Sequence, residues 1–169
     1  EMWALVHQQL YNAGEAMLTG DKELAYKVIS RERRVNAFEL KIDSDCEDII
    51  ALYAPVAVDL RFVLAMYKIN TNLERLGDFA ESIARFAGNL PEGAPVDPQL
   101  IKETRVEEML HELLSMLTLS QEAFEKESSE IASRIFLKDN FIDEINHNST
   151  KIIADYIEKH PGSALVGLY

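Results

Sequence analysis

Pairs of carboxylates one helical turn apart are the residues of this chain whose types and spacing could do chemistry. Glu74 and Asp78 form one pair, and Asp139 and Asp143 form another. Like charges at this spacing destabilise a helix by roughly 0.2–0.5 kcal/mol per pair. A hard cation that prefers carboxylate oxygen would reverse that repulsion. The pairs therefore indicate metal binding, with a merely solvated acidic surface as the simpler alternative.

A further acidic line accompanies these pairs on an earlier helix. Glu32 and Glu39 border its apolar seam, together with Asn36 and Asp43, because residues about one turn apart share a helix face. Asn36 offers only a neutral carbonyl oxygen, so a site built here carries less charge and binds a metal more weakly. The candidate metal-ligating residues are Glu32, Glu39, Glu74, Asp78, Asp139 and Asp143.

Two Glu-x-x-His pairs suggest a different kind of metal protein. Glu108 precedes His111 at this spacing, and Glu144 precedes His147. Di-iron four-helix bundles use two such pairs with two further Glu residues, all facing inward. Both pairs here point away from the apolar seams, so surface histidines are the preferred interpretation. No catalytic set of residues is predicted, and the chain is not expected to be an enzyme.

The only cysteine, Cys46, excludes an internal disulfide. It falls in an apolar helix seam, where a buried and inert thiol is the expected outcome rather than a nucleophile.

Helices must position all of these side chains, since apolar residues recur at spacings of three and four throughout the chain. Asp21 and Asp59 are the expected N-caps of the second and third helices, and Pro55 ends the second. The expected helices run up to Thr19, from Lys22 to about Ala54, from Leu60 to about Ala87, from about Val106 to Ser128 or Ser129, and from there to His160–Pro161.

The chain divides into two parts at a proline-rich stretch. Three of its five prolines fall between Gly88 and Pro98, which predicts a linker. The two long helices also match at a constant offset, which predicts an internal duplication. We expect an all-α fold of two repeated antiparallel three-helix bundle units, the second lacking most of its last helix. The expected division is residues 1–90 for the first unit, 91–98 for the linker and 99–169 for the second, incomplete unit.

The net charge of the chain limits the kinds of molecule that it is expected to bind. Seventeen Lys and Arg residues stand against 29 Asp and Glu, a formal net charge of −12. Such a surface repels the phosphate backbone of nucleic acids and disfavours docking on anionic lipid. It suits cations or a basic protein partner. No apolar run approaches the length of a transmembrane helix, so membrane insertion is not expected.

Both ends of the chain suggest a piece of a longer protein. It begins at Glu1 without a start methionine, and residues 165–169 are apolar, like a helix cut short. The apolar seam of the fifth helix would then lack its partner. An exposed seam of that length favours self-association or helix exchange, so a homo-oligomer is expected.

The third helix resembles a known family. Its start reads Asp59-Leu60-Arg61-Phe62, and further on it reads Asn72-Leu73-Glu74-Arg75-Leu76-Gly77-Asp78-Phe79-Ala80-Glu81. These stretches look like the signature of the PhoU family of phosphate-uptake regulators, and Glu74 and Asp78 fit that family's acidic motif. The resemblance implies two homologous three-helix bundles with metal clusters at their surface, of iron or zinc in some members. Magnesium is a further candidate, and binding is expected to be weak or absent because Asn36 interrupts one motif and no counterpart of Glu74 is present.

The same resemblance implies a function. PhoU-like proteins are cytoplasmic adaptors that couple a phosphate ABC transporter, through its ATPase subunit, to a sensor histidine kinase, and they repress the phosphate-starvation response. Two alternatives stay open at this point. The chain could be a regulatory PhoU-like domain of a sodium–phosphate cotransporter, or a ferritin-like metal–carboxylate protein.

Overall fold

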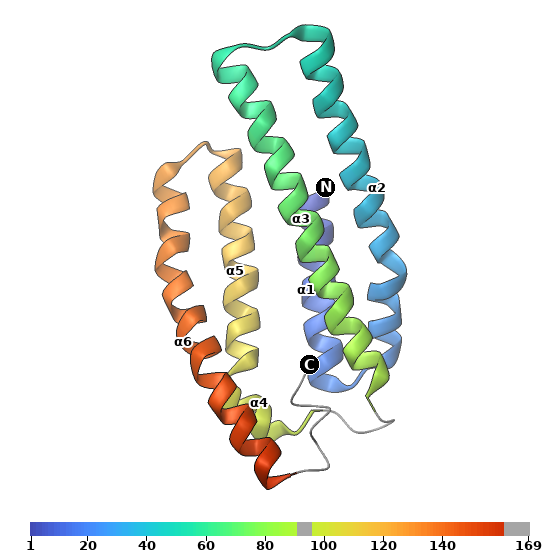
Figure 1. The fold of residues 1–169 in the computed structure, drawn as a ribbon, viewed down its shortest axis with the longest axis vertical. Helices are drawn as coiled ribbons and strands as arrows, with labels where there is room; N and C mark the ends of the chain where they lie inside the picture. The colour runs from blue at the N-terminus through green and yellow to red at the C-terminus, as the bar shows by residue number, and fades with distance from the viewer. Residues whose placement is uncertain (91–95, 161–169) are drawn as a thin grey trace.

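A computed structural model describes residues 1–90 and 96–160 of the chain. In those residues every regular element is a helix and no strand is present, so the all-helical class is confirmed (Figure 1). The helices are α1 (Met2–Thr19), α2 (Lys22–Tyr53), α3 (Ala57–Asn89), α4 (Pro98–Thr104), α5 (Val106–Glu125) and α6 (Ser129–Lys159).

The chemistry of the turn residues sets most helix ends where the sequence predicts them. Gly20 ends α1 in the left-handed conformation, with φ of 71°, which glycine adopts without steric cost. The side chain of Asp21 then caps α2 by accepting a hydrogen bond of 2.9 Å from the backbone N–H of Leu24. Ser128 caps α6 in the same way.

The start of α3 differs from the expected one. The helix begins at Ala57, with Val56 at the N-cap position, and Asp59 lies in the first turn instead of capping it. A carboxylate in the first turn still stabilises the helix, because it interacts with the positive end of the helix dipole.

The predicted linker ends in a short helix, α4, that was not among the helices expected from the sequence. Asp97 accepts a hydrogen bond from the backbone N–H of Gln99, and Pro98 occupies the first turn of α4, where its missing N–H costs nothing. The further helix expected after Pro161 falls in residues 161–169, which lie outside the described residues. The division at 91–98 stays a prediction.

The first three helices form an antiparallel bundle, which α2 and α3 extend beyond the start of α1 (Figure 1). One end of the bundle core consists mainly of alanines, which let the helices approach closely. Larger side chains, among them Val6, Val35 and Leu73, fill the other end. Gln9 of α1 is fully buried and donates a hydrogen bond of 2.8 Å to the carbonyl oxygen of Val28, which ties α1 to α2.

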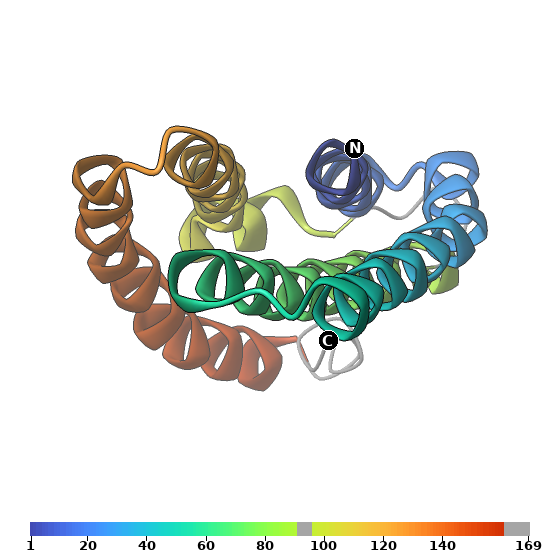
Figure 2. The same cartoon turned by 90° about the horizontal axis from the view of Figure 1, so that it is seen from above.

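Helix α5 connects the two parts of the molecule by packing against α1. The ring of Phe124 on α5 lies against Trp3 of α1 and Phe62 of α3, with centroid distances of 5.6 and 5.5 Å. Near the other end of α1, Gly14 meets Leu110, so the two helices run antiparallel. Seen from above, α5 and α1 stand next to each other, and α3 lies along one side of both (Figure 2).

Helix α6 packs on α4 and α5. Ile145 is its one buried residue among those described. The Lys138 ammonium of α6 lies 2.6 Å from a carboxylate oxygen of Glu112 on α5. Phe136 and Leu137, by contrast, are 73% and 75% exposed. Over the described ranges, no helix combines the length and the apolar character needed to cross a membrane.

Candidate functional site

The acidic residues of α2 and α3 meet because the two helices approach closely at Gly77. A Cβ atom at this position would lie 2.8 Å from Cγ1 of Val35 on α2, a distance that side chains do not tolerate without a shift. Gly77 lies between Glu74 and Asp78 in the sequence. The close approach therefore brings this acidic pair next to the acidic line of α2.

The electrostatics show which carboxylates come together. Burial raises the pKa of Glu74, and the nearby negative charges of Asp78 and Glu39 raise it further. Burial also raises the pKa of Glu32, followed by the charges of Glu81 and Asp78. Four of the six predicted metal-ligating residues are thus neighbours at the α2–α3 interface, and Glu81 joins them. A group of mutually repelling carboxylates is a place where a cation would stabilise the charged forms.

Asn36 adds an uncharged oxygen to this group. It forms a hydrogen bond with Glu32 that lowers the pKa of that carboxyl, against the effect of burial. Its own Oδ1 is buried and has no hydrogen-bond partner in the described part of the chain. An unpaired buried carbonyl oxygen is costly, and it is also a ligand type that hard cations accept.

The donor set of this acidic interface, defined as Glu32, Asn36, Glu39, Glu74 and Asp78, fits a hard cation by its chemistry. Carboxylate and amide oxygens suit Mg, Mn or Fe. As the side chains stand, however, no three His, Cys, Asp or Glu residues in ranges 1–90 and 96–160 are placed so that they could hold a metal ion. Coordination would therefore require a change of rotamer in at least one carboxylate.

The other predicted pair does not belong to this group. Asp139 and Asp143 are exposed on α6, which packs on α4 and α5 and not on α2. Neither side chain forms an ion pair or hydrogen bond within the described residues. The structure thus brings four of the predicted ligands together and leaves these two apart.

The Glu-x-x-His pairs do not assemble an inward-facing di-iron site. Glu108 forms an ion pair of 2.7 Å with Arg105, and the hydrogen bond from Arg105 lowers the pKa of Glu108. His111 is exposed on α5, and Glu144 and His147 are exposed on α6. These positions agree with the interpretation as surface residues.

The Cys46 thiol is buried. Burial raises its pKa, and the neighbouring carboxylates Asp43 and Asp45 raise it further. A thiol with a raised pKa is a poor nucleophile, as the seam position predicted.

Sequence reasoning missed Asn70 as a residue that positions the acidic interface. Its side chain is 1% exposed and donates hydrogen bonds of 2.9 Å to the carbonyl oxygen of Glu39 and 2.7 Å to the carboxylate of Asp43. These bonds fix α3 against α2 one turn before Glu74. The spacing of four residues from Glu74 was the available signal, because it places Asn70 on the same stripe of the helix.

Comparisons with known proteins cover most of the chain. The family model of the PhoU domain matches residues 1–87 and 106–166. The phosphate-specific transport system accessory protein PhoU homolog of Aquifex aeolicus is 32% identical over 161 residues, which are 95% of this chain and 71% of the relative. The Escherichia coli phosphate-specific transport system accessory protein PhoU is 35% identical over 143 residues, 85% of this chain and 58% of that protein.

Two solved structures share the fold. The crystal structure of PhoU from Pseudomonas aeruginosa superposes with a TM-score of 0.89 at 27% identity, and the match covers 98% of this chain and 79% of that one. The phosphate transport system regulatory protein PhoU from Streptococcus pneumoniae superposes with a TM-score of 0.82 at 29% identity, over 94% of this chain and 73% of that one.

Proposed function

The chain belongs to the PhoU family, and from this premise we propose that it acts as a cytoplasmic adaptor of phosphate signalling. It is a phosphate-transport accessory protein and not an enzyme. In the proposed role it contacts the ATPase subunit of a phosphate ABC transporter and a sensor histidine kinase, and it represses the phosphate-starvation response when phosphate is plentiful. The observation that carries the proposal is the match of the PhoU domain over most of the chain.

A direct binding measurement tests this role. Purified 169-residue chain is passed over the immobilised ATPase subunit and, separately, over the cytoplasmic part of the kinase. An adaptor is expected to bind both saturably, whereas a regulatory domain of a sodium–phosphate cotransporter is expected to bind neither. Absence of binding to both proteins would contradict the proposal.

We further propose that the acidic interface binds a divalent or ferric cation through Glu32, Glu39, Glu74 and Asp78. Two observations support this: the pKa values of Glu32 and Glu74 are raised by burial and by neighbouring carboxylates, and the buried Oδ1 of Asn36 lacks a partner among the described residues. The cation would neutralise the repulsion between the helices. Asp139 and Asp143 would contribute half of a second, open site.

Removing the acidic pair tests the metal proposal. After incubation with Fe(II) or Mn(II) and desalting, elemental analysis of Glu74→Ala/Asp78→Ala should show loss of the bound metal. A chelator should lower the melting temperature of the unsubstituted protein but not that of Glu74→Ala/Asp78→Ala, because a ligand that binds the folded state stabilises it. The control variant Glu47→Ala/Glu158→Ala removes the same charge from exposed positions. Equal metal content in both variants and the unsubstituted protein would contradict the metal site and leave the adaptor role standing.

A further inference from the structure

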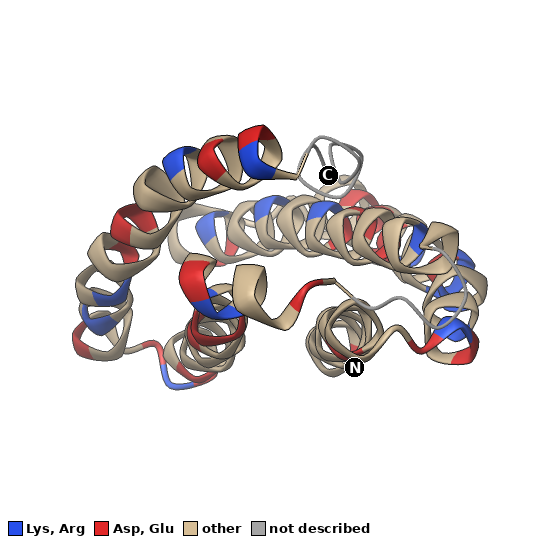
Figure 3. Cartoon of the chain, turned by 90° about the horizontal axis from the view of Figure 1, so that it is seen from below, with Lys and Arg blue, Asp and Glu red and all other residues tan. Residues whose placement is uncertain are grey.

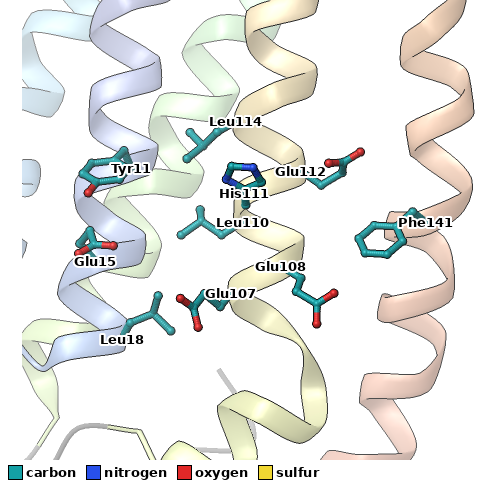
Figure 4. A pocket seen from close by; sticks show the side chains of 10 residues that line it. All are labelled: Tyr11, Glu15, Leu18, Glu107, Glu108, Leu110, His111, Glu112, Leu114 and Phe141. Carbon is teal, nitrogen blue, oxygen red and sulfur yellow. The ribbon is translucent and has the colours of Figure 1, made fainter.

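A groove lies between α1 and α5 (Figure 4). It opens on the side of these two helices that faces away from α3. It encloses about 460 Å³ and is continued towards α4 by a second hollow of about 550 Å³. The two hollows share Glu15, Leu18, Glu107 and Glu108 in their walls. Their volumes are in the range of pockets that hold ligands or several side chains.

The floor of the groove is apolar. Leu18 comes from α1, and Leu110 and Leu114 come from α5 (Figure 4). Gly14 brings the two helices together at the floor, since a Cβ at this position would meet the Leu110 side chain. Tyr11 stands 45% exposed on the α1 wall, where its ring could receive a cation on its face.

Every Asp, Glu, Lys or Arg that lines the first hollow is a glutamate, whereas Lys102 and Arg105 line the second hollow together with three of these glutamates. Glu108 and Glu112 are paired, with Arg105 at 2.7 Å and Lys138 at 2.6 Å. Glu15 and Glu107 have no ion pair within the described residues.

These two free carboxylates stand on opposite walls of the groove, one on α1 and one on α5 (Figure 4). Glu15 is also the sole Asp, Glu, Lys or Arg of α1. Seen from below, the ribbon of α1 is accordingly almost wholly uncharged, whereas α5 carries several acidic segments (Figure 3).

An apolar floor between two unpaired carboxylates is complementary to one kind of occupant. We propose that the α1–α5 groove binds a basic amphipathic helix of a partner protein. Its apolar face would lie on Leu18, Leu110 and Leu114, and its Lys or Arg side chains would pair with Glu15 and Glu107. Helices dock in grooves through apolar anchors in this way, and complementary charges set their orientation.

Two other occupants fit the groove less well. A second copy of this chain has 17 Lys and Arg residues against 29 Asp and Glu, so it is a poor source of the basic side chains that Glu15 and Glu107 would pair with. A metal ion fits poorly because Glu108 and Glu112 are already paired with Arg105 and Lys138, and the two unpaired carboxylates, Glu15 and Glu107, come from opposite walls of the groove. The proposed groove deepens the proposed adaptor role, because an adaptor needs a surface that binds a partner protein. A binding test with a synthetic peptide involves no component of phosphate signalling. Its failure can therefore be distinguished from a failure of the adaptor role.

The test uses fluorescence anisotropy with a labelled peptide that forms an amphipathic helix with Leu on one face and Arg flanking it. The whole chain is titrated against this peptide and against a scrambled peptide of the same composition. The variant Glu15→Gln/Glu107→Gln removes the two rim charges. The control Glu47→Gln/Glu158→Gln removes the same charge from exposed positions that do not line the groove. Circular dichroism verifies that both variants keep their helical content.

We expect the rim variant to bind the amphipathic peptide about tenfold more weakly than the control does, and the difference to shrink at high salt because exposed ion pairs are screened. A Leu18→Ser variant should also weaken binding while leaving the effect of salt unchanged. Equal losses in the rim and control variants would show attraction by net charge alone and overturn the proposal. So would equal binding of the scrambled peptide, or the absence of saturable binding.

Discussion

The negative charge of Glu74 at neutral pH lowers the stability of the folded protein, and the size of this effect can be measured. Because its pKa is raised above the ordinary value of 4.5, the folded state takes up a proton more readily than the unfolded state. The stability that this proton uptake contributes is present below pH 4.5 and is lost as the pH rises through the raised pKa. Glu74→Gln should therefore stabilise the metal-free protein at pH 7 by about 0.2–0.5 kcal/mol, the size of one like-charge pair in a helix.

Urea unfolding at a series of pH values checks this expectation. The stabilisation by Glu74→Gln should vanish well below pH 4.5, where the carboxyl is protonated in both the folded and the unfolded chain. Glu47→Gln, at an exposed position of α2 outside the acidic interface, should have little effect on stability at any pH. A stabilisation that persists unchanged at low pH would show that charge is not its cause.

Gly77 is the residue that sets the distance between the two acidic helices. In Gly77→Ala the new methyl group would meet Val35 at 2.8 Å, and overpacking of this kind typically costs about 1–3 kcal/mol. The higher helix propensity of alanine offsets up to about 1 kcal/mol of this cost, so a net loss of stability is expected. At Gly88 the nearest atom to a new Cβ is 3.9 Å away, and Gly88→Ala should be neutral or stabilising. Denaturant unfolding of both variants measures the two effects separately, because Gly88→Ala changes helix propensity without a close contact, whereas Gly77→Ala changes both propensity and packing.

At the scale of whole elements, α6 packs on α4 and α5 but buries few of its own side chains, and Ile145 is the one buried residue among those described. The side chains of Lys138 and Glu112 are only 28% and 20% exposed, whereas the ion pair of Lys41 with Asp45 is 70% and 56% exposed. Lys138→Ala leaves the Glu112 carboxylate half-buried without its partner, which should cost about 1–2 kcal/mol. Lys41→Ala should change stability by less than about 0.5 kcal/mol.

Hydrogen exchange shows which helices lose stability in Lys138→Ala. In Lys138→Ala the amides of α6 should lose protection before those of α2 and α3, because locally unfolding elements are the ones with few buried contacts. A uniform loss of protection over all helices would instead indicate that α6 unfolds together with the whole bundle.

At the scale of the whole molecule, the exposed apolar surface of α6 predicts self-association of this 169-residue chain. Phe136 and Leu137 are 73% and 75% exposed on a helix that buries one residue among those described, and large exposed apolar patches mark interaction surfaces. Sedimentation velocity should show concentration-dependent dimers or larger species, and Phe136→Ser/Leu137→Ser should shift the chain towards monomer. The control Leu52→Ser/Tyr53→Ser removes equally exposed side chains at the α2–α3 turn and should leave association unchanged. A monomer at every concentration would contradict the prediction.

The sequence alone determined the helices and several of their ends, because these depend on local interactions. The caps at Asp21 and Ser128 and the left-handed Gly20 act within one turn of the chain. The acidic motif of Glu74 and Asp78 is equally local, and it indicated the family. Even the unpredicted α4 had a local signal, since Asp97 and Pro98 form a typical helix start.

Only the tertiary structure decided which of the candidate ligands meet. Periodicity assigns Glu32 and Asp139 to a face of their helices, but not which neighbouring helix that face meets. Gly77 lets α2 approach α3, so Glu32 and Glu39 come together with Glu74. Asp139 and Asp143 are on a helix that packs elsewhere and stay apart from them. The groove between α1 and α5 likewise exists only because two helices more than eighty residues apart in the sequence pack antiparallel, a long-range contact that no local pattern encodes.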